Sequence, residues 1–117
     1  MLSWSSQQSD IEIDLAVVAR GRGDVGVPYS DELLRFASAA ACLDDDVAGM
    51  VEMADSRQAL VAVAGDSMMI DTAAVAANFH MMTRLADGTG ARFTPARLEA
   101  SATAIEIMGT ADMLSRR

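Results

Sequence analysis

The sequence has no lysine, a single cysteine and a single histidine among its 117 residues. Without lysine, an enzyme that forms a Schiff base is excluded, and so is a nucleotide site that depends on the lysine of a Walker motif. Cys42 alone provides neither an intrachain disulfide nor a Cys-x-x-Cys redox pair. A chain without such pairs is expected in a cytoplasmic setting.

Basic residues are scarce, since nine arginines face seventeen acidic residues and the net charge is -8. The arginines are scattered, and only Arg116 and Arg117 are adjacent. Binding to phosphate-rich surfaces requires a basic face. Neither a nucleic acid nor an anionic membrane is therefore an expected partner.

Long apolar runs are also missing, because Asp71, Asn78 and His80 interrupt the longest candidate. A membrane-spanning helix needs about 18 or more consecutive apolar residues, so none is expected. The N-terminal stretch lacks the basic and apolar regions of a signal peptide.

The composition indicates one small domain with more apolar surface than its own core can bury. Hydrophobic residues make up 51% of the chain, but 22 of them are alanine. The mean hydropathy is nevertheless +0.21 beside the charge of -8. We expect a single helical domain over residues 1–117, with 1–9 disordered, that buries apolar surface between subunits of a homo-oligomer.

The N-terminal half contains one ambiguous segment and one predicted helix. Residues 11–20 fit both strand and helix spacing, and a helix is preferred because no strand partner follows. Residues 21–29 form a glycine-rich connector. Ser30 is the expected N-cap of a helix over 31–42.

The C-terminal half predicts three further helices, or four if Ser56 divides the first of them. The first two have expected ranges of 44–65 and 67–87, with Gly65 as the stop of the first and Asp66 or Ser67 as the cap of the second. The third is expected to begin at Thr94 and Pro95, with Arg116 and Arg117 at the negative end of its dipole. Leu98, Ala102, Ile105 and Met108 line one face of that last helix. The apolar excess is expected chiefly on residues 67–87 and on the face around Ile105 and Met108. The prediction is thus an all-α compact bundle of five or six helices.

Four motifs favour structure over chemistry. Residues 21–26 match G-x-G-x-x-G, but Pro28 and the cap at Ser30 place the helix start too late for a dinucleotide site. Residues 44–46 lack the spacing of a calcium loop and fit a solvated helix start. The pairs 68–69 and 81–82 are methionines at helical spacing, which favours core or interface packing over copper binding. No metal and no cofactor are expected.

Two single residues remain as candidates for chemistry. His80 has no nearby ligand set for zinc, and packing or an interface is its favoured role. The alternative is an acid/base role for His80, with Arg84 holding an anionic substrate. Cys42 precedes three aspartates, which disfavour a reactive thiolate, so a buried apolar role is expected.

Residues 71–90, DTAAVAANFHMMTRLADGTG, resemble the C-terminal helix of the alkylhydroperoxidase D and carboxymuconolactone decarboxylase family. Arg84 and Asp87 are spaced to bond each other, and Gly88 and Gly90 are expected to provide a left-handed exit. The resemblance implies an all-α fold and assembly into dimers, trimers or hexamers. Redox members use Cys-x-x-Cys followed by histidine, whereas Cys42 is followed by Leu43, Asp44 and Asp45. Thiol peroxidase activity is therefore not expected.

These observations favour a non-redox, self-associating helical protein that acts as an interaction or small-ligand-binding module. The alternative is an enzyme of the decarboxylase or isomerase type that uses His80.

Overall fold

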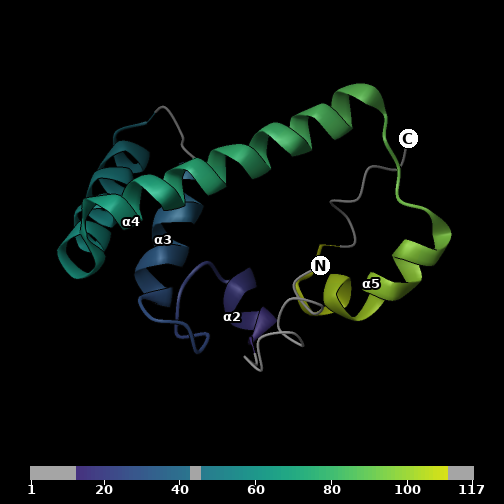
Figure 1. Cartoon of the computed structure of the whole chain (residues 1–117), viewed down its shortest axis with the longest axis horizontal. Coiled ribbons are helices and arrows are strands. Elements are labelled where there is room, and N and C mark those ends of the chain that lie inside the picture. The colour runs from purple at the N-terminus through teal and green to yellow at the C-terminus, as the bar shows by residue number, and fades with distance from the viewer. Residues whose placement is uncertain (1–12, 43–45, 111–117) are drawn as a thin grey trace.

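The computed structural model describes residues 13–42 and 46–110, and every regular element in that part of the chain is a helix. The elements are α2 (Leu15–Ala19), α3 (Ser30–Ala41), α4 (Val47–Thr89) and α5 (Pro95–Ile107), arranged as in Figure 1. The predicted all-α class is confirmed. The predicted count of five or six is wrong for the described residues, which form four helices.

Helix α4 bends at Gly65 into a first arm, residues 47–64, and a second arm, residues 66–89 (Figure 1). Gly65 has φ 83° and ψ 169°, a region essentially restricted to glycine. Because only this residue leaves helical backbone angles, the two helices predicted on either side of it form one bent element. Ser56 does not divide the first arm, where it is fully buried and its hydroxyl donates to the Met53 carbonyl oxygen at 3.2 Å.

The ends of α4 and α5 follow local sequence chemistry. The Asp46 carboxylate accepts a hydrogen bond from the Gly49 backbone N–H at 2.7 Å, so the last residue of the acidic run caps α4, while residues 44 and 45 lie outside the described residues. Gly90 ends α4 with φ 68°, and the Ala91 N–H donates to the Ala86 carbonyl in a Schellman arrangement. Thr94 caps α5 as predicted by accepting from the Arg97 N–H, with Pro95 at the first helical position.

Three details of the predicted helix ends are wrong. Gly88 lies within α4 with helical angles, so Gly90 alone provides the left-handed exit. Asp66 and Ser67 make no capping hydrogen bond in the described residues, although the second arm begins directly after Gly65. Ser30 is the first residue of α3 rather than its cap, and Tyr29 precedes it with a left-handed φ of 61°.

The Ser30 hydroxyl serves the connector between α2 and α3. It accepts from the Val25 N–H at 3.1 Å and donates to the Asp24 carboxylate at 3.3 Å. Residues 21–29 form the expected connector, and these bonds fold it back onto the start of α3. The ambiguous segment before it is helical over Leu15–Ala19, where Asp14 provides the cap. The part of that segment at 11–12, like residues 1–9, lies outside the described residues.

The core is small and lies mainly where α3 packs against α4, while α2 contacts α5. Four hydrophobic residues are buried among those described: Val17, Val25, Phe36 and Leu60. Fifteen large hydrophobic side chains of the described residues are exposed instead. The described helices therefore bury few of their large apolar side chains.

Candidate functional site

The second arm of α4 turns its smaller side chains toward the rest of the molecule. Met69, Thr72, Ala73 and Ala76 are half-buried, and their spacing of three, one and three residues places them on one face. This is the side of the arm that the chain itself partly covers. The far end of the arm stands apart from the other helices in Figure 1.

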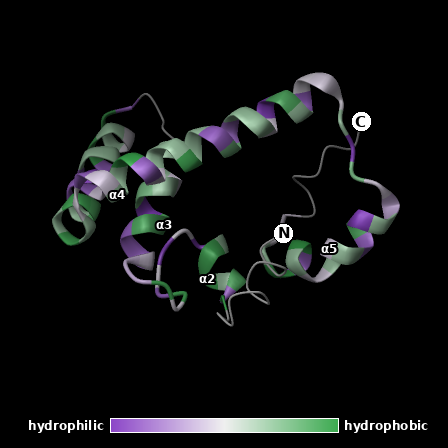
Figure 2. Ribbon diagram, in the orientation of Figure 1, coloured by the Kyte–Doolittle hydropathy of each residue, from purple (hydrophilic) through white to green (hydrophobic). Residues whose placement is uncertain are grey.

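The larger apolar side chains of the same arm face solvent. Seven of them are exposed, by 39% to 64%: Met68, Ile70, Val75, Phe79, Met81, Met82 and Leu85. They form two neighbouring stripes, which we name the Phe79 stripe (Met68, Val75, Phe79 and Met82) and the Leu85 stripe (Ile70, Met81 and Leu85). Hydrophobic colour accordingly recurs along the whole arm in Figure 2. The apolar excess expected on residues 67–87 is thus located on an open face.

The second part of the expected excess is smaller. Ile105 on α5 and Met108, the C-cap of α5, are half-buried, while Leu98 remains 38% exposed. The Phe79 and Leu85 stripes are therefore the larger apolar surface.

Among the described residues, α4 is the one helix long and apolar enough to cross a membrane by length and composition. Only 6% of its most apolar window is buried. Core helices of soluble proteins meet the same length and composition criteria. The sequence analysis predicts no membrane-spanning candidate, whereas α4 is one by length and composition.

His80 is exposed on the second arm of α4, so the prediction of a packed histidine is wrong, while an interfacial role remains a prediction. It lines none of the three cavities described below. Arg84, one turn later, is also exposed. Arg84 and Asp87 form no ion pair or hydrogen bond, although their spacing would allow one. Within residues 13–42 and 46–110, no ion pair involves His80.

Cys42 is exposed, which corrects the prediction of a buried thiol. It follows the last helical residue of α3 and has φ -115° and ψ 31°, so the chain leaves the helix at this residue. The thiol lies at a cavity instead of in the core.

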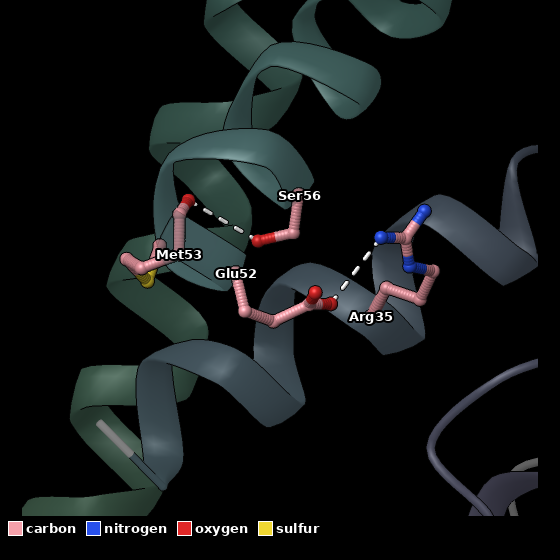
Figure 3. A network of polar contacts seen from close by, with 4 residues as sticks. All are labelled: Arg35, Glu52, Met53 and Ser56. Atoms are coloured by element: carbon pink, nitrogen blue, oxygen red, sulfur yellow. Dashed lines mark hydrogen bonds and ion pairs between the residues drawn. The ribbon is translucent and has the colours of Figure 1, made fainter. Parts of the chain in front are cut away.

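That cavity, which we name the arginine cavity, has a volume of about 260 Å³ and lies between the connector, α3 and the first arm of α4. Three arginines line it, Arg20, Arg22 and Arg35, together with Ser38, Cys42 and Glu52. Arg35 donates from Nη2 to Glu52 Oε1 at 3.2 Å, as Figure 3 shows. Sequence reasoning missed this cluster, because the arginines lie up to fifteen residues apart and meet only in the fold.

Gly21 explains how the connector reaches α3 beside this cavity. It has φ +67°, and a Cβ at residue 21 would lie 2.5 Å from the Ser38 Oγ. A close approach of this kind is open only to glycine. Since Gly21 separates Arg20 from Arg22, this close approach places the backbone of both arginines beside α3.

The connector also lines two further cavities, which have volumes of about 470 and 590 Å³. Their titratable lining residues are acidic or tyrosine, among them Asp24, Asp31 and Glu32. The described ranges hold no cluster of three or more potential metal ligands. Residues 21–26 form the predicted turn, and α3 begins only at Ser30.

No family model matches the chain, and neither a curated protein nor a solved structure does so. The two features that the chain itself presents are therefore the exposed apolar face of α4 and the arginine cavity.

Proposed function

We propose that the protein is a non-redox, self-associating helical protein whose second α4 arm binds a second copy of the chain. The observation that supports this proposal most strongly is the exposure of seven large apolar side chains on one arm, against four buried hydrophobic residues among all those described. Contiguous apolar surface of this kind marks interaction sites.

The spacing along the arm suits a partner helix. The exposed side chains of the Phe79 stripe are spaced by seven, four and three residues: Met68, Val75, Phe79 and Met82. An average spacing of 3.5 residues keeps one seam turned toward a partner helix, as in coiled coils. The second copy would therefore bring its own α4 arm to this seam.

The area available also suits a pair of subunits. Each exposed side chain of this size offers on the order of 100 Å², so the four of the Phe79 stripe offer roughly 400 Å². A stable interface buries about 800 Å² on each partner. The Phe79 stripe thus supplies about half of what a dimer requires from one subunit.

A bilayer is a poorer match for the same arm. Asp71 and Arg84 bound a stretch of only twelve residues without formal charge, 72–83. At 1.5 Å per residue this helical stretch measures about 18 Å, whereas the hydrocarbon core measures about 30 Å. Gly65 bends the helix just before it. We therefore favour a protein partner for this face.

The resemblance of residues 71–90 to the alkylhydroperoxidase D family agrees with self-association, because members of that family commonly assemble as oligomers. The missing Cys-x-x-Cys pair supports a non-redox role. The proposal does not depend on the resemblance, since the exposed stripes support it directly.

The test is light scattering after size exclusion on the full chain at micromolar concentration, with two matched variants. Phe79→Glu places a charge within the Phe79 stripe, while Phe93→Glu places the same charge at a phenylalanine of similar exposure, 60% against 56%, outside α4. We expect a homo-oligomer for the wild type and for Phe93→Glu. Phe79→Glu should weaken association by about 100-fold or more, because it buries an unpaired charge.

Three results would overturn the proposal. One is a wild-type chain that elutes as a 12.3 kDa monomer, and another is equal behaviour of Phe79→Glu and Phe93→Glu. The third is co-flotation of the wild type with neutral lipid vesicles that Phe79→Glu abolishes, which would assign the stripe to a membrane.

A further inference from the structure

We propose that the arginine cavity binds a small oxyanion, a phosphate or carboxylate group, through Arg20 and Arg22, with Arg35 oriented by Glu52. This site is separate from the Phe79 stripe and does not rest on self-association. It assigns a ligand class to a chain whose overall charge of -8 argues against anion binding.

The first support is the local concentration of positive charge. The described residues contain seven arginines, and three of them line this one cavity. One carboxylate, that of Glu52, also lines it. The lining side chains therefore carry a net charge of +2 in an acidic protein.

The second support is that two acids close to the cavity, Asp31 and Asp46, do not line it. The Asp31 carboxylate accepts from the Gly23 N–H at 2.6 Å, and the Asp46 carboxylate accepts from the Gly49 N–H at 2.7 Å. Arg20 and Arg22 are exposed and take part in no ion pair of the described residues.

The third support is the geometry that holds the arginines. The contact between Gly21 and Ser38 fixes the backbone of the connector, and the hydrogen bond from Gly23 to Asp31 fixes it again two residues later. Arg35 is oriented by Glu52 and still has free N–H groups, because a guanidinium has five. Planar guanidinium groups bind phosphate and carboxylate in a bidentate manner.

The size of the cavity limits the ligand. Sites for drug-sized molecules have volumes of about 300 to 1,000 Å³, and this cavity has about 260 Å³. A free phosphate, a small dicarboxylate or a short phosphorylated metabolite fits that volume, whereas a dinucleotide does not. The Ser38 hydroxyl at the same cavity offers a neutral donor to such a ligand.

Cys42 provides a built-in reporter, because it is the single cysteine, is exposed and lines the cavity. Its rate of reaction is measured with a dianionic aromatic disulfide and with a neutral one, and the ratio of the two rates is compared between variants. Positive charge at a site raises the rate for an anionic reagent. The wild-type ratio includes the contribution of Asp44 and Asp45, which follow Cys42 in the sequence.

We expect Arg20→Gln combined with Arg22→Gln to lower this ratio by about tenfold at low salt. Glu52→Gln should raise it, because a carboxylate is removed from the lining. Arg92→Gln combined with Arg97→Gln removes the same charge from exposed positions that do not line the cavity and should leave the ratio unchanged.

Inorganic phosphate and malonate are then added at constant ionic strength, with chloride as the reference. We expect one or both to protect Cys42 in a saturable manner, and the arginine double variant should lose about tenfold in apparent affinity. Protection by phosphate alone or by malonate alone distinguishes the two ligand classes. No protection beyond that by chloride, or an unchanged ratio in the Arg20 and Arg22 variant, would overturn the proposal. The oligomeric state does not enter either readout.

Discussion

Arg35 and Glu52 join α3 to the first arm of α4 through a contact of 3.2 Å between Nη2 and Oε1, the one ion pair within residues 13–42 and 46–110. Their side chains are 31% and 49% exposed. Exposed pairs of this kind contribute about 0 to 1 kcal/mol, because water screens the charges and ordering the side chains costs entropy. The contact therefore orients Arg35 at the cavity more than it stabilises the fold.

Glu52→Gln is expected to change the free energy of unfolding by less than about 1 kcal/mol, as measured by urea denaturation at fixed protein concentration. The same variant should raise the reactivity of Cys42 toward an anionic reagent. The two measurements therefore distinguish the effect of Glu52 on stability from its effect on the charge of the cavity. A loss of stability well above that value would show that the pair is a structural element of the α3 and α4 contact.

The hydrophobic contact between α3 and α4 should matter far more. Leu60 is fully buried, whereas Val63 on the same arm is 44% exposed. Leu60→Ala is expected to cost about 2 to 5 kcal/mol, because it leaves a cavity in a small core. Val63→Ala removes an exposed side chain and should stay within about 0.5 kcal/mol.

Both variants are compared by urea denaturation at one protein concentration, since association adds to the apparent stability. Similar losses at the two positions would contradict the assignment of Leu60 to the core. They would indicate that Val63 is covered in the folded protein.

The sequence predicts the helix ends well where the signal is local. Hydrogen bonds to residues within a turn or two define the start of α5 at Thr94 and both ends of α4, at Asp46 and Gly90. Pro95 occupies the first position of α5. Such contacts depend on neighbours in the chain, so residue type and spacing are sufficient to predict them.

Prediction failed where a tertiary contact competes with the local one. The Ser30 hydroxyl has the chemistry of a cap, but in the fold it bonds Val25 and Asp24 of the connector. Cys42 follows three alanines in the sequence, yet it lies at the surface where α3 ends. In both cases the outcome depends on where the connector and α4 pack.

The two candidate sites also differ in how far the sequence predicts them. The apolar excess of residues 67–87 is visible as a 3.5-residue spacing and could be predicted, whereas its exposure could not. The arginine cavity gave no signal at all, because Arg20 and Arg35 are separated by a turn-rich connector whose path depends on Gly21.

The bend in α4 gives the last prediction, which compares two glycines in the same helix. Gly65 has φ +83° and Gly88 has helical angles, and a Cβ at either position would meet nothing within 4 Å. Any effect of alanine is therefore conformational rather than a steric clash. Gly65→Ala is expected to cost about 1 to 3 kcal/mol, while Gly88→Ala should stabilise by up to about 1 kcal/mol, since alanine favours a helix.

Urea denaturation and far-ultraviolet circular dichroism check this pair. Opposite signs at the two positions are expected, with unchanged helix content for Gly88→Ala. If Gly65→Ala instead gains stability and helix content, the two arms prefer to form a straight helix and the bend does not require glycine. Because the bend sets the direction in which the second arm leaves the α3 and α4 core, such a result would also move the Phe79 stripe relative to the arginine cavity.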